Sequence, residues 1–181
     1  MAKDFDPHRL DVLRFAQEGG VIDSSEHLRS FRRLVAETPQ DADIARNVRW
    51  RARGELLNPQ RHQPEVWVHL EADATMPLVC QRCLTPVDVP VRVQRAFRFV
   101  ADEATAAAED DAAEEDLLAL SRSFDLLELV EDELLMELPV APRHDVCPEP
   151  VKMSVADPDF DAAAAEKENP FAVLGRLKPG K

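Results

Sequence analysis

The stretch PVDVPVRVQRAFRFV, residues 86–100, decides the fold because apolar and polar residues alternate along almost all of it. The apolar residues that share one face are Val87, Val89, Val91, Val93, Phe97 and Phe99. A period of two places successive side chains on opposite faces of an extended chain, so the pattern predicts a half-buried β-strand. Arg95 is the single exception on the apolar face, and Pro90 predicts an edge strand or a bulge.

Two stretches before it show the same alternation. They are VRWRARGELL, residues 48–57, and PEVWVHLEA, residues 64–72. Short connections without intervening helices join the three segments, which favours an antiparallel sheet or a small barrel over about 45–100.

Helical patterns flank this β-rich region. Residues 6–18 are expected to form a helix capped by Asp6, and a second helix is expected from residue 24 or 25 to about residue 37. A leucine-rich helix is expected over about 124–137. The sequence therefore predicts an α+β fold, in which N-terminal helices and the leucine-rich helix flank the sheet.

The same patterns suggest a domain organisation. Residues 1–147 are expected to form a single α+β domain, with an acidic mobile loop at 101–116. The alanine content of that loop also permits a fluctuating helix. Residues 148–168 read as a linker, and 169–178 as a short C-terminal helix that Asn169 caps.

The acidic charge is concentrated in one segment. The whole chain of 181 residues has a net charge of −13. Residues 101–137 carry fourteen acidic side chains and one basic one, so this segment accounts for the entire excess. The remaining sequence is nearly neutral, with an arginine-rich front part.

Nothing in the sequence predicts a membrane segment or an exported protein. No apolar run approaches the ~18 residues that a transmembrane helix needs, and the first ten residues lack a signal-peptide hydrophobic stretch. A cytoplasmic location is therefore expected. Three cysteines do not make a secreted disulfide framework, and in a reducing compartment a CxxC pair more often indicates metal or redox chemistry.

The cysteines form a candidate zinc site. Cys80 and Cys83 are two residues apart, and His144 and Cys147 repeat that spacing. Three thiolates and an imidazole supply the four ligands of a structural zinc site. The alternative is that Cys80 faces the core, Cys83 ends a hairpin, and the other pair is incidental. A thioredoxin-like redox site or a catalytic zinc is less favoured, because the surrounding motifs are absent.

A candidate RNA-binding surface lies on the polar side of the predicted strands. Many RNA-binding domains combine phosphate contacts with base stacking on a sheet. The candidate residues are Arg46, Arg49, Arg51, Arg53, Trp67, Arg92 and Arg98. The alternative is an ordinary solvent-exposed face whose arginines the acidic segment neutralises.

A candidate protein-binding surface lies in the acidic segment, which could mimic nucleic acid toward a basic partner. Its residues are Glu109, Asp110, Asp111, Glu114, Glu115 and Asp116. Such charge runs are more commonly just solvated loops. No catalytic motif accompanies these surfaces, so no enzymatic activity is expected.

Three motifs together resemble one known family. CQRCLTPVDVPV with FRFV, then DLLELVEDELLMELPVAPRHDVC, and finally NPFAVLGRLK look like the YceD family over most of residues 75–178. The resemblance implies a bacterial protein that supports accumulation of large-subunit (23S) ribosomal RNA through its synthesis, processing or stability. It carries over no enzymatic activity. Other branches of the family have more cysteines after the leucine-rich helix, where this sequence has His144 and Cys147.

The expected function is a non-catalytic factor in ribosome biogenesis, with ribosomal RNA or a pre-ribosomal particle as the partner. The runner-up is an acidic escort for a basic large-subunit ribosomal protein or assembly factor, without direct RNA contact. A zinc- or thiol-dependent enzyme is the least favoured class.

Overall fold

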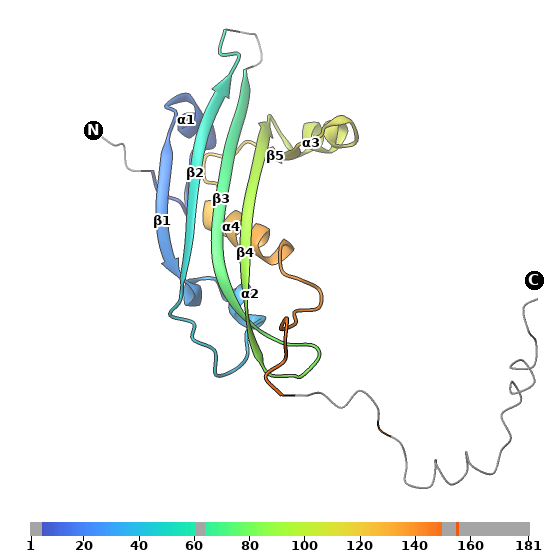
Figure 1. Cartoon of the computed structure of the whole chain (residues 1–181). Helices are drawn as coiled ribbons and strands as arrows, with labels where there is room; N and C mark the ends of the chain where they lie inside the picture. Colours follow the sequence, from blue (N-terminus) through green and yellow to red (C-terminus); the bar gives the residue numbers. More distant parts are fainter. Residues whose placement is uncertain (1–4, 61–63, 150–154, 156–181) are drawn as a thin grey trace, which may run out of the picture. The chain divides into compact units, whose positions relative to one another are not determined.

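The computed structural model describes residues 5–60, 64–149 and 155. Its strands form one open sheet with the order β1-β2-β3-β4-β5 (Figure 1). The strands are β1 (Val21–His27), β2 (Asn47–Leu57), β3 (Glu65–Val79), β4 (Pro86–Val100) and β5 (Asp116–Ala119). The predicted α+β fold is confirmed.

The sheet is mixed rather than purely antiparallel, and it does not close into the barrel offered as one alternative. Strands β1 to β4 pair antiparallel, whereas β5 pairs parallel with β4 along Phe97–Val100. Strand β5 can do so because the chain leaves the end of β4, passes through a helical segment and returns alongside it. Pro90 lies on β4 outside the stretch paired with β5, so the prediction of an edge position is confirmed.

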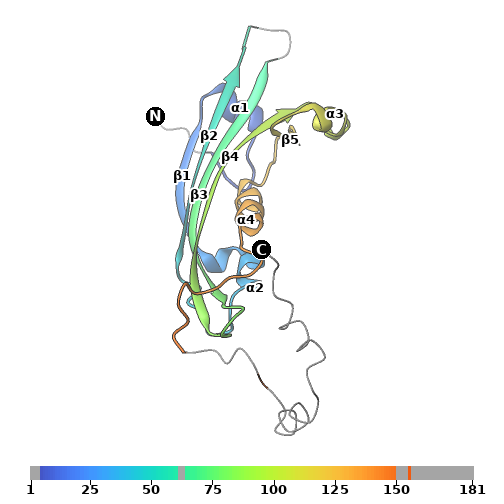
Figure 2. The same cartoon turned by 45° about the vertical axis from the view of Figure 1, so that its right-hand side comes forward.

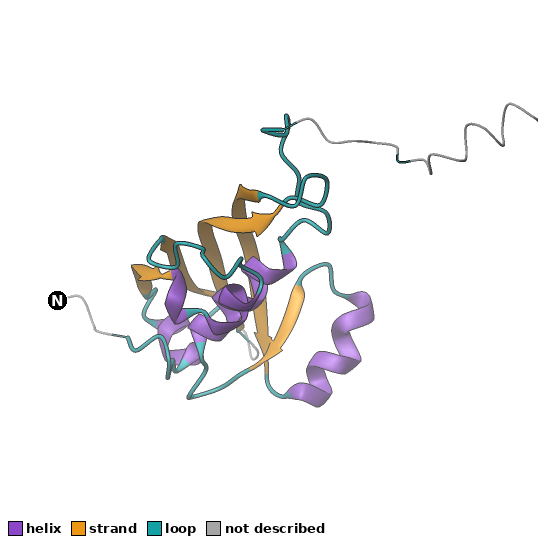
Figure 3. Cartoon of the chain, turned by 90° about the horizontal axis from the view of Figure 1, so that it is seen from below, coloured by secondary structure: helices purple, strands orange, loops and turns teal. Residues whose placement is uncertain are grey.

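Six helical segments accompany the sheet in the described part of the chain. They are α1 (Val12–Gln17), the 3-10 turn η1 (Leu28–Ser30), α2 (Arg32–Ala36), α3 (Glu103–Glu109), the 3-10 turn η2 (Asp110–Ala112) and α4 (Leu126–Met136), of which the two turns are single-turn elements. Helices α1, α2 and α4 lie on the same side of the sheet (Figures 2 and 3). Helix α3 projects beyond β5 (Figure 1).

The core lies between the sheet and these three helices. Alternate residues of β2 and β3, such as Trp50, Ala52, Val68 and Leu70, are buried there. The opposite side of the sheet, which we call the outer face, is covered by no helix within the described residues. The alternation that predicted the strands is therefore the alternation between the core and the outer face.

The three predicted strands are confirmed, but the N-terminal helices differ from expectation. Helix α1 begins after Asp11, whose side chain accepts a hydrogen bond from the amide of Arg14, so Asp6 is not its cap. The helix expected from residue 24 or 25 to 37 was wrong over its first half, which forms β1 and η1. Strand β1 pairs with β2 through seven residue pairs. Its backbone N–H and C=O groups therefore form hydrogen bonds with a neighbouring strand, and not the bonds within a helix that the periodicity predicted.

The acidic segment 101–116 contains regular structure. Asp102 caps α3 by accepting hydrogen bonds from the amide and the hydroxyl of Thr105, both at 2.8 Å. These bonds lower the pKa of Asp102, chiefly through the Thr105 amide. Alanine, the best helix former, fills most of the helix. The segment is therefore not a loop throughout, and its mobility stays a prediction.

The leucine-rich helix is confirmed as α4, which Asp125 caps. Its Glu131 links α4 to α2: one carboxylate oxygen accepts hydrogen bonds from the amides of Arg33 (2.6 Å) and Leu34 (3.2 Å), and the other from the Arg33 guanidinium (3.0 Å). Glu131 is only 9% exposed. The C-terminal helix expected at 169–178 lies outside the described residues, as does most of the linker expected at 148–168.

No helix in the described part of the chain is both long enough and apolar enough to cross a membrane.

Candidate functional site

The first cysteine pair lies in a tight turn between β3 and β4. Cys80 directly follows β3 and is buried. Its amide donates to the carbonyl of Thr85 (2.9 Å), and its carbonyl accepts from the amide of Leu84 (2.8 Å). Leu84 has a φ of 61°, in the left-handed region, and this conformation closes the turn. The turn holds Cys83 close to Cys80.

The loop after α4 brings His144 to this turn. The amide of Gln81 donates to the carbonyl of Pro142 (2.8 Å), and the guanidinium of Arg82 donates to the carbonyl of His144 (2.8 Å). The Nε2 of His144 donates to the carbonyl of Pro86 at 3.0 Å. This bond fixes the ring so that Nδ1 faces the Sγ of Cys83, 3.5 Å away. A hydrogen bond on the far ring nitrogen is the usual support of a metal-binding histidine.

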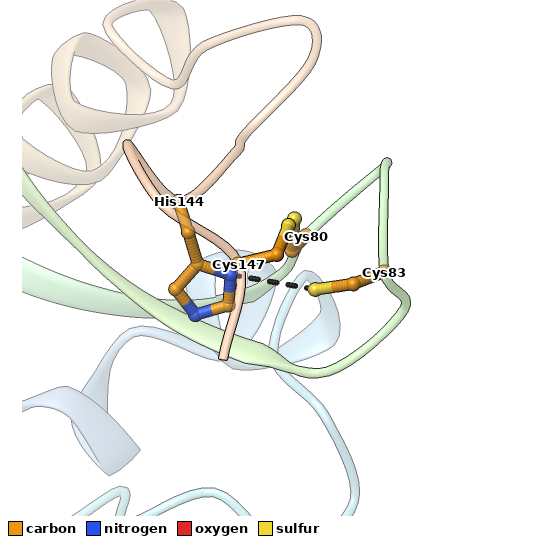
Figure 4. Close-up of side chains that lie close together, drawn as sticks. All are labelled: Cys80, Cys83, His144 and Cys147. Carbon is orange, nitrogen blue, oxygen red and sulfur yellow. Dashed lines mark hydrogen bonds between the residues drawn. The ribbon is translucent and has the colours of Figure 1, made fainter. Parts of the chain in front are cut away.

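The four predicted ligands meet in one cluster (Figure 4). The ligand atoms of Cys80, Cys83, His144 and Cys147 all lie within 4.8 Å of one another, and the three cysteines form no disulfide. Ligands at the corners of a zinc tetrahedron are about 3.8 Å apart when the metal–sulfur distance is about 2.3 Å. The donor set and its spacing therefore fit a metal ion that thiolates and imidazole coordinate.

The ionisation of the cluster also suits a metal. Burial raises the pKa of Cys80, but backbone hydrogen bonds from Cys83, His144 and Arg82 outweigh it and lower this pKa to about 5. The hydrogen bond to Cys80 in turn raises the pKa of His144. A thiolate at neutral pH is the form that binds metal, so no proton has to leave Cys80 first.

The candidate RNA-binding residues fall into two groups. Six of them occupy the outward positions in the alternation of their strands and so belong to the outer face. They are Arg49, Arg51 and Arg53 on β2, Trp67 on β3, and Arg92 and Arg98 on β4. In the register of the sheet, Arg49, Asp73 and Arg92 form one cross-strand row, and Glu55, Trp67 and Arg98 form another. Arg46 is not among them, because it precedes β2 and pairs with Asp88 at 2.6 Å.

Carboxylates offset the arginines of the outer face. Arg49 donates two hydrogen bonds to Asp73, at 3.1 and 2.7 Å, and Arg53 pairs with Glu55 at 3.1 Å. Asp23 and Glu71 flank Arg51 on the neighbouring strands. Arg51 and Arg92 form no ion pair with any residue that the structure describes. The sequence pattern located the arginines but not these partners, since only the register shows which side chains are neighbours.

The outer face also carries a pair of nearly parallel rings. Trp67 and His69 have ring centroids 6.4 Å apart and an interplanar angle of 15°. The Nε2 of His69 is 2.7 Å from a carboxylate oxygen of Glu55, and this hydrogen bond is the main reason why the pKa of Glu55 is lowered. His69 was not among the predicted site residues, although the sequence places it on the same polar side of its strand as Trp67.

Two predicted surfaces meet at Arg98. Its guanidinium pairs with Glu109 at 3.1 Å and with Glu115. These two carboxylates belong to the candidate protein-binding set, and Asp116 of that set lies 3.9 Å from Arg95. Asp110, Asp111 and Glu114 form no ion pair within the described residues. The acidic segment is thus attached to the end of the outer face through Arg98.

Comparison with known proteins gives one family and no structural relative. Residues 68–178, more than half of the chain, match the family described as Large ribosomal RNA subunit accumulation protein YceD. No solved structure matches the chain. The matched range includes most of β3, all of β4 and α4, and all four residues of the metal-ligand cluster. The family description names a role in ribosomal RNA accumulation rather than an enzymatic activity. The chain belongs to the YceD family of large ribosomal RNA subunit accumulation proteins.

Proposed function

We propose that this protein supports accumulation of the large-subunit (23S) ribosomal RNA as a non-catalytic binding factor that contacts RNA through the outer face of its sheet. One observation carries the proposal: a sheet face that none of the described helices covers presents arginines on two strands beside a half-exposed tryptophan. Guanidinium groups bind phosphates, and aromatic rings stack on bases.

The charge balance of the outer face limits how this contact can work. Because Asp73 and Glu55 already hold Arg49 and Arg53, the net attraction for phosphate is weaker than the number of arginines suggests. Arg51 and Arg92 are the guanidinium groups that can bind phosphate without breaking an ion pair of the described chain. They face a shallow depression of about 770 Å³ that Arg49 and Gln94 also line.

The metal-ligand cluster completes the proposal as a structural element. We propose that zinc binds Cys80, Cys83, His144 and Cys147 and joins the β3–β4 turn to the loop after α4. Four protein ligands fill a tetrahedral shell, which leaves no open position for a substrate or a catalytic water. The zinc would thus stabilise the end of the sheet without doing chemistry.

Reversing the charge of Arg51 and Arg92, the two outer-face arginines that form no ion pair with the described residues, tests the RNA contact. In the Arg51→Glu/Arg92→Glu variant we expect RNA affinity to fall at least ~10-fold, because two phosphate contacts become repulsive. The salt dependence of log K should become shallower by about 1.4, since each phosphate contact on a single strand contributes about 0.7. Fluorescence anisotropy of a labelled 23S fragment at several salt concentrations measures both effects.

The matched control is Arg29→Glu/Arg32→Glu, which changes the charge equally at exposed arginines outside the outer face. Equal losses in both double variants would show that net charge, and not the outer face, governs binding.

A second candidate function has its own observation. Asp110, Asp111 and Glu114 are accessible acidic groups on or next to η2, and this charge suits a basic ribosomal protein. If the protein is an escort, neutralising these three residues to Asn, Asn and Gln should weaken the binding of a basic large-subunit ribosomal protein while RNA binding is unchanged. Calorimetric titration measures the first affinity. Unchanged protein binding would contradict the escort function.

A further inference from the structure

We propose that Trp67 and His69 form a stacking site for an unpaired nucleotide base, which makes the outer face selective for single-stranded RNA. This inference rests on the proposed function and names the form of RNA that it binds. The charge balance of the outer face leads to it: where carboxylates offset the arginines, phosphate attraction alone holds RNA weakly, so another interaction has to contribute.

The two rings are placed to accept a base. They stand two residues apart on the outward side of β3, nearly parallel to each other, and both residues are half-buried. A planar ring that stacks on one of them is therefore also aligned with the other. The neighbour of His69 on β4 is Ala96, whose small side chain leaves room beside the imidazole.

Hydrogen bonds hold both rings by their edges. The Nε1 of Trp67 donates to Glu65 at 3.3 Å, and the Nε2 of His69 lies 2.7 Å from Glu55. Edge contacts fix the orientation of a ring and leave its faces available for stacking. Because the rings are already oriented, the entropic cost of ordering these side chains when a base binds is smaller.

Groups that can bind a phosphate and a base edge lie next to His69. A depression of about 520 Å³ adjoins His69, and Arg51, Arg53 and Gln94 are among the residues that line it. A nucleotide stacked at His69 would have its phosphate within this arginine-lined depression, and the amide of Gln94 can both donate to and accept from a base edge. In a duplex the base faces are already stacked on each other, so this combination favours a single strand.

Tryptophan fluorescence gives a direct test, because the chain has only two tryptophans. Trp50 is 2% exposed and lies in the core, so a Trp50→Phe variant leaves Trp67 as the reporter. Titration with single-stranded oligoadenylate or oligouridylate of about twelve nucleotides should quench Trp67 saturably. The duplex of the two should bind at least ~10-fold more weakly.

Substitutions at Trp67 in the otherwise native chain separate stacking from charge. By anisotropy of the labelled single strand, Trp67→Leu should lose about 5- to 150-fold in affinity, the range for one stacked base. Trp67→Phe should retain most of the affinity, because phenylalanine also stacks. Val21→Ala, at a 47%-exposed position of β1 opposite Arg53, serves as the outer-face control and should bind like the native chain.

The outcomes distinguish this inference from the function on which it rests. If Trp67→Leu binds the single strand as tightly as the native chain while Arg51→Glu/Arg92→Glu does not, the stacking site is overturned and the RNA contact stands. Equal affinity for single strand and duplex would also overturn it. If the native chain binds neither RNA form, both the stacking site and the proposed RNA contact are wrong.

Discussion

The Cys83→Ser variant is expected to lose its bound metal and to melt about 10 °C below the native protein. Native chains purified under reducing conditions should contain about one zinc each. A ligand present at 1,000 times its dissociation constant stabilises the native state by about 4 kcal/mol. For a chain of this size, 1 kcal/mol corresponds to about 2–4 °C in the melting temperature. Elemental analysis and thermal denaturation followed by circular dichroism measure the two effects.

The adjacent residue provides the control for this experiment. Leu84→Ala changes an apolar side chain of the same turn that is 74% exposed and offers no ligand atom, so zinc should remain bound. Treating the native protein with a strong chelator should reproduce the melting temperature of Cys83→Ser, and adding zinc should restore it. The structural zinc would be contradicted if the native protein contained no zinc. It would also be contradicted if Cys83→Ser melted at the same temperature as the native protein.

The Glu131→Ala variant is expected to lower the free energy of unfolding by about 3 kcal/mol. The carboxylate of Glu131 accepts from two backbone amides at the start of α2, and the Leu34 bond is buried. An unsatisfied buried donor costs about 1–3 kcal/mol, and the ionic bond with Arg33 is lost as well. Urea denaturation measures the change.

Asp132 supplies the matched comparison, since it is the next residue of α4 and binds the same guanidinium of Arg33. Its side chain is 48% exposed and accepts a hydrogen bond from no backbone amide of the described residues, so Asp132→Ala should cost less than about 1 kcal/mol. If the two variants lose similar stability, the ion pair with Arg33 would be the important contact, and not the amides of α2.

Strands β2, β3 and β4 could be predicted from the sequence because each has one buried face. In 48–57, 64–72 and 86–100 the alternation of apolar and polar residues follows directly from the burial of one face. Strand β1 could not be predicted in this way. Its sequence VIDSSEH has no apolar face, and exposed residues alternate along it with half-buried ones. What makes it a strand is its pairing with β2, a tertiary contact that helical periodicity in the following residues obscured.

The residues of the candidate sites could be located from the sequence to different degrees. Equal spacing in Cys80-x-x-Cys83 and His144-x-x-Cys147 pointed to one site, because metal ligands have to converge whatever their separation in the chain. The outer face was harder. Whether Arg49 attracts phosphate depends on Asp73, which lies on another strand, and only the register between β2 and β3 makes them neighbours. The pairing of Arg98 with Glu109 and Glu115 depends in the same way on how α3 and β5 follow β4.

If the proposed contacts with RNA and with a basic protein both form, Arg98 links them thermodynamically. Its guanidinium is engaged by two carboxylates of the acidic segment, so a phosphate that binds it has to displace them. A basic protein that takes up Glu109 and Glu115 would release Arg98 for the phosphate, and the phosphate would release the two carboxylates for the protein. Each ligand would then raise the affinity for the other by the same factor. Such positive cooperativity would favour a complex that holds ribosomal RNA and a basic protein together over either binary complex.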